Sequence, residues 1–178
     1  AWRALVLHWE RKPDSLLALL RRLPQRVFDA QNDYLPTALY SAWAHRLSGD
    51  GEAAEAAFDS ARVLLDSAVA RLSDDWRVHA ARGLTLAGLG QRREAQREAS
   101  WLQQSAVYRE DAVNGPLVSA QRARILAGIG EADAALEEIE RLMARPSRFS
   151  VQVLRLDPLW DPIRDDPRFQ ALLEKYGN

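Results

Sequence analysis

Apolar residues recur along this chain with the spacing of a helix, and glycines divide the helical stretches. After each of Gly49, Gly90 and Gly130, an alanine five residues on begins an apolar helical stripe. This period places apolar side chains on one helix face, and glycine commonly ends a helix because it enters the left-handed conformation at low cost. The pattern therefore predicts helix pairs joined at glycine turns. No stretch alternates in the manner of a strand, so we expect essentially no β-structure.

Small residues on these stripes predict close helix crossings. The three alanines, which lie in the second helix of each pair, are Ala54, Ala95 and Ala135. We expect them to be buried where two helices cross. The residues four positions on are expected to meet the next pair, and they are Phe58, Ala99 and Ile139. In the second copy, the nearby Trp101 is expected to fill the space that the short Ala99 leaves.

The helix before each glycine carries a small residue three positions ahead of a larger one. The pairs are Gly83 with Leu86, Ala123 with Leu126 and, in the first copy, Ala42 with His45. This order of small residue, large residue, glycine and alanine resembles the tetratricopeptide repeat, whose unit has 34 residues in two helices. The resemblance implies an all-α superhelix, or solenoid, of antiparallel helix pairs that acts as a binding module. The glycines here are 41 and 40 residues apart, so we expect extended second helices or longer links.

We expect one domain over residues 1–178, with about nine to eleven helices. Its parts are a degenerate repeat over 1–34, repeats over 35–74, 75–114 and 115–146, and a C-terminal cap over 147–178. In the degenerate repeat, the apolar pattern predicts helices over residues 2–9 and 15–23. Pro24 and Pro36 are expected to bracket a loop.

The C-terminal part is rich in Asp-Pro pairs, which favour helix starts. Asp suits the N-cap and proline suits the first helical position, so Asp157 and Asp166 are expected to begin short helices that cap the last repeat. This segment resembles the end of tetratricopeptide regions in large bacterial signalling proteins, where such regions follow kinase, winged-helix or cyclase domains. The resemblance implies a regulatory or scaffolding module of a multidomain protein. The chain opens at Ala1 directly in helical sequence, so we expect it to be a piece of a longer protein.

Composition argues against several classes of function. The formal net charge of −1 gives no electrostatic reason for nucleic-acid binding. The absence of cysteine excludes disulfides and thiolate metal sites, and no apolar run approaches the roughly 18 residues of a membrane span. We therefore expect no cofactor, no nucleic acid and no membrane contact. The expected compartment is the cytoplasm, or the periplasm if a missing upstream segment tethers the protein.

Candidate catalytic groups have structural explanations. No two of His8, His45 and His79 have the spacing of a helical metal pair. We interpret Asp165-Asp166 as part of a helix start and Glu137-Glu138 as lying on a solvated helix face. The chain is therefore not expected to be an enzyme.

This pattern favours protein–protein interaction as the function. In the repeat register, the residues expected to line a concave peptide-binding groove are Trp43, Arg46, Arg77, Leu84 and Arg124. Tryptophan and arginine are frequent binding hot spots, and several arginines would favour an acidic peptide or a terminal carboxylate. The other tryptophans are expected in the core, and they are Trp2, Trp9, Trp76, Trp101 and Trp160. Two alternatives stay open: the arginines pair with nearby carboxylates, or the repeats form a dimerisation or spacer element of a sensor or transcriptional regulator, which includes assembly as a homodimer.

Overall fold

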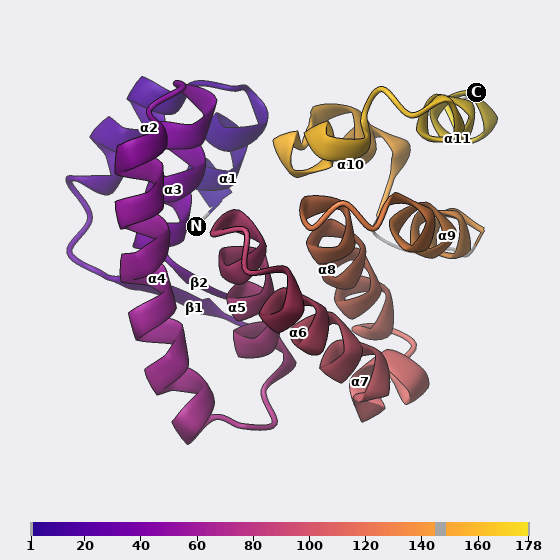
Figure 1. Cartoon of the computed structure of the whole chain (residues 1–178), viewed down its shortest axis with the longest axis horizontal. Coiled ribbons are helices and arrows are strands. Elements are labelled where there is room, and N and C mark those ends of the chain that lie inside the picture. The colour runs from indigo at the N-terminus through magenta and orange to yellow at the C-terminus, as the bar shows by residue number, and fades with distance from the viewer. Residues whose placement is uncertain (1, 145–148, 178) are drawn as a thin grey trace.

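The computed structural model describes residues 2–144 and 149–177 and is mostly helical. The N-terminal part, on the left in Figure 1, contains α1 (Trp2–Trp9), α2 (Pro13–Leu20), β1 (Val27–Ala30), β2 (Asp33–Pro36), α3 (Thr37–Leu47) and α4 (Gly51–Arg71). The middle contains α5 (Trp76–Gly88), α6 (Arg92–Gln104), α7 (Ala106–Glu110), α8 (Gly115–Gly128) and α9 (Ala132–Met143). The C-terminal part contains α10 (Val151–Leu156), the 3-10 helix η1 (Pro158–Ile163) and α11 (Pro167–Lys175). The expectation of an all-α chain is therefore confirmed in its main character.

Three helix hairpins dominate the packing: α3 packs on α4, α5 on α6, and α8 on α9. Each hairpin turns at one of the predicted glycines, whose φ angles are 79°, 70° and 80° at Gly49, Gly90 and Gly130. In every turn, the amide of the residue after the glycine donates 2.9 Å to a carbonyl five residues earlier, which satisfies an orphan acceptor at the helix end. Helix α4 is long, with 21 residues, and the five-residue α7 lies in the link between α6 and α8.

A β-hairpin corrects the prediction of a strand-free chain. Strands β1 and β2 pair antiparallel, with Phe28 opposite Leu35, in the segment that was expected to be a loop between Pro24 and Pro36. Each strand has only four residues, so a period of two leaves almost no trace in the sequence. Phe28 anchors the hairpin because its buried ring meets Tyr40 of α3 edge-on at 5.6 Å. Pro36 stands at the end of β2 and serves as the residue before α3.

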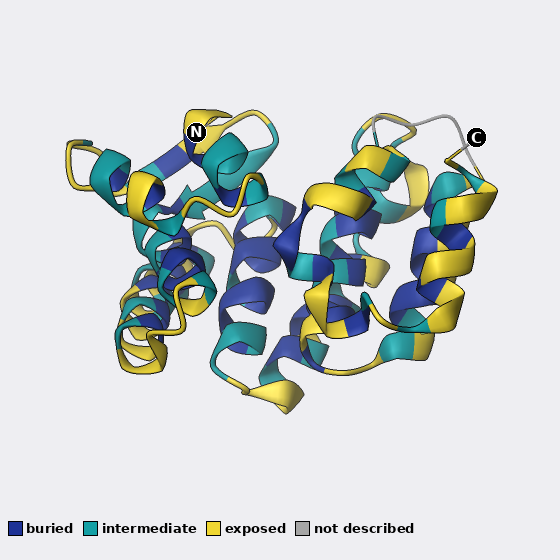
Figure 2. Cartoon of the chain, turned by 90° about the horizontal axis from the view of Figure 1, so that it is seen from above, coloured by how far each residue is buried: buried dark blue, intermediate teal, exposed yellow. Residues whose placement is uncertain are grey.

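The core follows the helix crossings, and Figure 2 shows buried stretches of helix toward the interior of the molecule and exposed stretches toward its outside. The predicted crossing residues Ala54, Ala95 and Ala135 are all buried. Trp101 is half-buried and stacks on the His79 ring at a centroid distance of 3.6 Å. In the C-terminal part, the core side chains are Leu154, Trp160, Ile163, Phe169 and Leu172.

The structure agrees with the expected aspartate N-caps but not with the expected burial of Trp2. The side chains of Asp157 and Asp166 accept hydrogen bonds from the amides of Leu159 and Arg168, which confirms them as N-caps. The placement of Trp2 in the core was wrong, because its side chain is 70% exposed and contacts Trp9 edge-on at 6.2 Å. Among the described helices, none combines the length and the apolar character that a bilayer span requires.

Enlarging a crossing alanine should destabilise the fold. Ala54→Leu, Ala95→Leu and Ala135→Leu each insert extra carbon atoms into a packed contact, and we expect each to lower the free energy of unfolding by about 1–3 kcal/mol. Urea denaturation followed by circular dichroism measures this change. Ala56→Leu is the matched control on α4, since Ala56 is exposed and its replacement should change stability by less than about 0.5 kcal/mol. Equal stability of all four variants would contradict the crossing positions.

Candidate functional site

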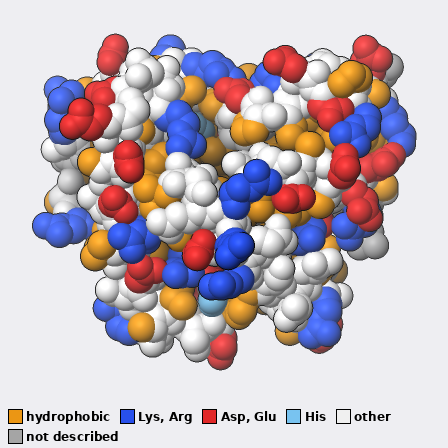
Figure 3. Space-filling view, viewed as in Figure 1, with side chains coloured by type: hydrophobic (Ala, Val, Ile, Leu, Met, Phe, Trp, Pro, Cys, Tyr) orange, Lys and Arg blue, Asp and Glu red, His pale blue; other side chains and the backbone are white. Residues whose placement is uncertain are grey.

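A pocket of about 440 Å³ lies where the ends of several helices converge. Residues of α1, α3, α5, α8 and η1, together with the segment after α1, form its walls. Figure 3 shows a hollow between the N-terminal and C-terminal parts of the molecule, with hydrophobic side chains in its depth and charged side chains around it. Its lining comprises His8, Arg11, Trp43, Arg46, Leu47, Leu84, Ala87, Gly88, Arg124, Gly128, Pro158, Leu159, Asp161 and Pro162.

Four of the five predicted groove residues line this pocket. Trp43, Leu84 and Arg124 each stand six residues before the glycine of their own hairpin, and the fold brings these equivalent positions together. Arg46 stands three residues before its glycine, one helical turn further along the same face. Four residues chosen from equivalent positions around the hairpin glycines therefore lie around one pocket.

Arg77 is the predicted groove residue that the structure places elsewhere. Its guanidinium bonds Asp75 and, at 3.0 Å, Asp29 of β1, and it donates to the carbonyl of Ala30. Arg77 stands thirteen residues before Gly90, about two helical turns from the level of Leu84. It therefore joins α5 to the β-hairpin that the sequence did not predict.

Arg46 is held in the pocket without a carboxylate. Its guanidinium lies over the Phe58 ring, 4.6 Å from the centroid, and donates to the carbonyl of Gly88 at the end of α5. None of the ion pairs among the described residues involves Arg46. Burial accordingly lowers its pKa below the ordinary value. A Cβ at Gly88 would lie 2.3 Å from the Phe58 ring, so glycine is what lets this ring support Arg46 so closely.

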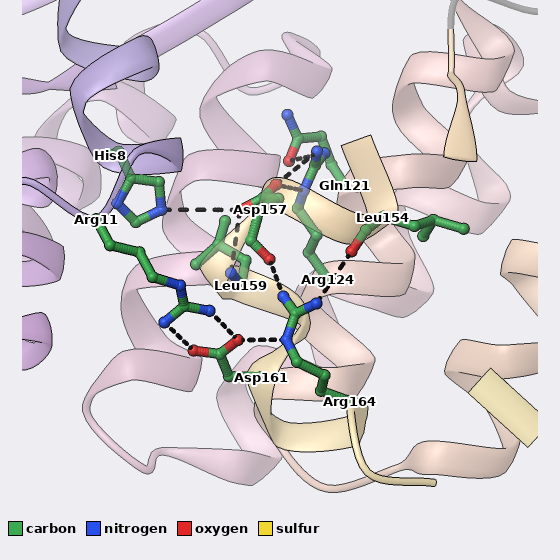
Figure 4. A network of polar contacts seen from close by, with 9 residues as sticks. All are labelled: His8, Arg11, Gln121, Arg124, Leu154, Asp157, Leu159, Asp161 and Arg164. Atoms are coloured by element: carbon green, nitrogen blue, oxygen red, sulfur yellow. Dashed lines mark hydrogen bonds and ion pairs between the residues drawn. The ribbon is translucent and has the colours of Figure 1, made fainter. Parts of the chain in front are cut away.

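Arg124 is already neutralised by the chain's own C-terminal part (Figure 4). Its Nε donates 2.9 Å to Asp157, and Nε2 of His8 lies 3.7 Å from the other oxygen of the same carboxylate. All three side chains are almost fully buried. Burial alone would raise the pKa of Asp157, but Arg124, His8 and the Leu159 amide outweigh it and hold that pKa below its ordinary value. Asp157 is thus both the cap that was predicted and a buried partner that was not.

The rim of the pocket carries a second, exposed ion pair. Arg11 donates two hydrogen bonds, of 2.9 and 2.6 Å, to the two oxygens of Asp161 in η1. Arg164 donates a third, of 2.8 Å, to the same carboxylate. Burial would raise the pKa of Asp161, but these arginines lower it on balance, while the bond to Asp161 raises the pKa of Arg11. The Arg11 and Asp161 side chains are 46% and 40% exposed.

A different charged cluster overturns the interpretation of Glu137-Glu138 as a solvated pair. The Glu137 side chain is 74% exposed, but that of Glu138 is 1% exposed. Glu138 pairs with Arg122 and accepts hydrogen bonds from Tyr108, at 2.9 Å, and Ser119. The amphipathic pattern assigned Glu138 to solvent, but donors from α7 and α8, together with Arg141 of its own helix α9, satisfy its charge in a buried position.

The second hairpin repeats this buried charge. Glu98 pairs with Arg82, and Nδ1 of His79 lies within hydrogen-bond distance of the Glu98 carboxylate, at 2.6 Å. Burial would lower the pKa of His79, but its bonds to Glu98 and to the Ser73 carbonyl raise that pKa on balance. The shared sequence signal is an arginine eight residues before each glycine and a glutamate eight residues after it. The first hairpin has Ser41 and Ala57 at these places.

The pocket offers binding contacts: an apolar wall, one unneutralised guanidinium, and a rim closed by an ion pair. Elsewhere in residues 2–144 and 149–177, no group of three or more His, Asp or Glu side chains is arranged to hold a metal ion. A comparison of the chain with protein-family models, curated proteins and solved structures finds no match.

Proposed function

We propose that this chain is a tetratricopeptide-like scaffold without enzymatic activity, which binds a carboxylate-bearing segment of a protein partner in the pocket between α1, α3, α5, α8 and η1. In this proposal the helix hairpins form a right-handed superhelix, and the pocket is its concave face. The chain would then be the interaction module of a larger bacterial signalling or regulatory protein. Support comes from the glycine-turned hairpins and from the three equivalent positions that meet in the pocket.

The observation that carries the proposal is that the Arg46 guanidinium lines the pocket and takes part in none of the ion pairs among the described residues. A guanidinium has five donors in a planar fork, and Arg46 directs one of them to the carbonyl of Gly88. Its stacking on Phe58 fixes the plane of the fork, which reduces the entropy lost when a carboxylate binds. Trp43 and Leu84 are core residues, each 6% exposed, and they present a small apolar surface beside it. A ligand with one carboxylate next to an apolar side chain matches this lining.

The test is direct binding of labelled octapeptides by fluorescence polarisation. One peptide set carries a central Leu-Asp-Leu sequence and the matched set carries Leu-Asn-Leu, so the two differ in a single charge. We expect binding of the acidic set only, with an affinity that falls as salt rises because the contact is partly exposed. Arg46→Met keeps an unbranched side chain against Phe58 and removes the charge, and we expect it to weaken binding at least about tenfold.

Arg93→Met is the matched control, because Arg93 is exposed on α6 outside the pocket. It should bind the acidic peptides as the unaltered chain does. Equal affinity of the Arg46 and Arg93 variants, or equal binding of the Asp and Asn peptides, would remove the pocket from consideration as the binding site.

A further inference from the structure

The rim of the proposed binding pocket is closed by the chain's own carboxylate. Asp161 lies in η1, and Arg11 follows α1, so the pair joins segments 150 residues apart in the sequence. Both residues line the pocket that also contains Arg46. The bond is bidentate, which is the geometry an arginine offers to any incoming carboxylate. The rim arginine is therefore occupied by the same chemical group that a partner would present.

The backbone of Arg11 gives independent evidence for a special role. Its φ is 52°, and Arg11 is the one non-glycine residue with positive φ in the part of the chain that the structure describes. The left-handed conformation is costly for a residue with a Cβ, and glycine would adopt it freely. Helix α1 could end there with less strain on a glycine. The position instead carries an arginine whose long side chain reaches the pocket rim. Backbone strain of this kind concentrates at functional sites.

The two acidic residues at the start and within η1 are held differently. Asp157 is buried against Arg124 and His8, so it fixes η1 on α8. Asp161 is 40% exposed and has a second arginine partner, Arg164. If Arg11 leaves, the Asp161 carboxylate stays neutralised by Arg164. Exchange at the rim therefore leaves no unpaired charge and does not disturb the buried anchor (Figure 4).

We propose that Asp161 is an internal competitor that occupies Arg11 until a partner's carboxylate displaces it. This inference rests on the proposed function of the pocket. In the free protein, Arg11 bonds Asp161 and closes the rim. In the complex, Arg11 turns to the partner beside Arg46, while Asp161 keeps Arg164. The competition weakens binding of any single carboxylate and so favours partners that engage both arginines.

The decisive variant is Asp161→Asn, measured with the Leu-Asp-Leu octapeptides in the full chain. Loss of the Asp161 charge should raise the affinity for the peptide by about two- to fivefold, because an exposed ion pair contributes a free energy of that size. Asp165→Asn removes a neighbouring exposed charge and should leave affinity unchanged. Arg11→Gly removes the rim cation and relieves the positive φ, so it should weaken binding without lowering the melting temperature.

A second measurement follows the arginines themselves by the NMR signals of their Nε–H groups. Addition of the peptide should shift the Arg11 and Arg46 signals and leave the Arg124 signal in place. Equal affinity of the Asp161→Asn variant and the unaltered chain, with an unmoved Arg11 signal, would overturn the competition while leaving the pocket as a binding site. Absence of binding to both proteins would overturn the competition together with the proposed function.

Discussion

Glu138→Ala is expected to lower the free energy of unfolding by about 3–5 kcal/mol, because it leaves a buried arginine without its counter-charge. The Arg122 side chain is 10% exposed and has Glu138 as its carboxylate partner. Removal of Glu138 also strands the hydroxyls of Tyr108 and Ser119, which donate to the same carboxylate. Chemical denaturation followed by tryptophan fluorescence measures the change.

The adjacent residue provides the matched control. Glu137→Ala removes the same side chain from a solvated position and should change stability by less than about 0.5 kcal/mol. A double replacement, Glu138→Leu with Arg122→Met, should recover most of the loss, since an apolar pair avoids the desolvation of two charges. If Glu138→Ala and Glu137→Ala are equally stable, the buried charge cluster does not exist in solution.

Asp157→Ala should cost a similar amount, about 3–5 kcal/mol, for a related reason. The substitution leaves Arg124 buried without a carboxylate and removes the cap from η1. Asp157→Asn keeps an oxygen that accepts the Leu159 amide, so it should retain about 1 kcal/mol more stability than the alanine variant. Asp165→Asn is the exposed control. Equal melting temperatures for all three variants would contradict a structural role of this carboxylate.

The contribution of Asp157 has a defined pH dependence. Its pKa is lowered in the folded protein, so its stabilising effect is complete above the unfolded-state pKa of about 3.9. The effect is lost progressively as pH falls through the lower, folded-state value. The stability difference between the unaltered chain and Asp157→Asn should therefore be constant near neutral pH and shrink below about pH 4.

Features of the fold that depend on local signals could be predicted from the sequence. The three glycine turns and the buried alanines follow from backbone conformation and helix period, and both are confirmed. The β-hairpin could not be predicted, because two four-residue strands are too short to show an alternation of apolar and polar residues. Trp2 was misplaced because an aromatic residue among apolar neighbours says nothing about whether another helix covers it.

The site was predictable only as far as equivalent repeat positions determine it. Trp43, Leu84 and Arg124 share one place relative to their glycines, so their convergence follows from the repeat. The sequence does not show which arginines lack a carboxylate partner, because those partners lie far away in the sequence. Arg124 meets Asp157 and Arg77 meets Asp29, at separations of 33 and 48 residues. Only the folded arrangement distinguishes these from Arg46.

The bond between Arg11 and Asp161 also bears on how the chain folds and unfolds. A row of helix hairpins that contact mainly their neighbours is assembled from short loops and frays from either end. Here the segment after α1 meets η1 across 150 residues of sequence, and the two can come together only once the hairpins between them have packed. We therefore expect the contact between Arg11 and Asp161 to form late in folding. As an exposed ion pair it should contribute only about 0–1 kcal/mol, so opening of one of these segments should favour opening of the other only slightly.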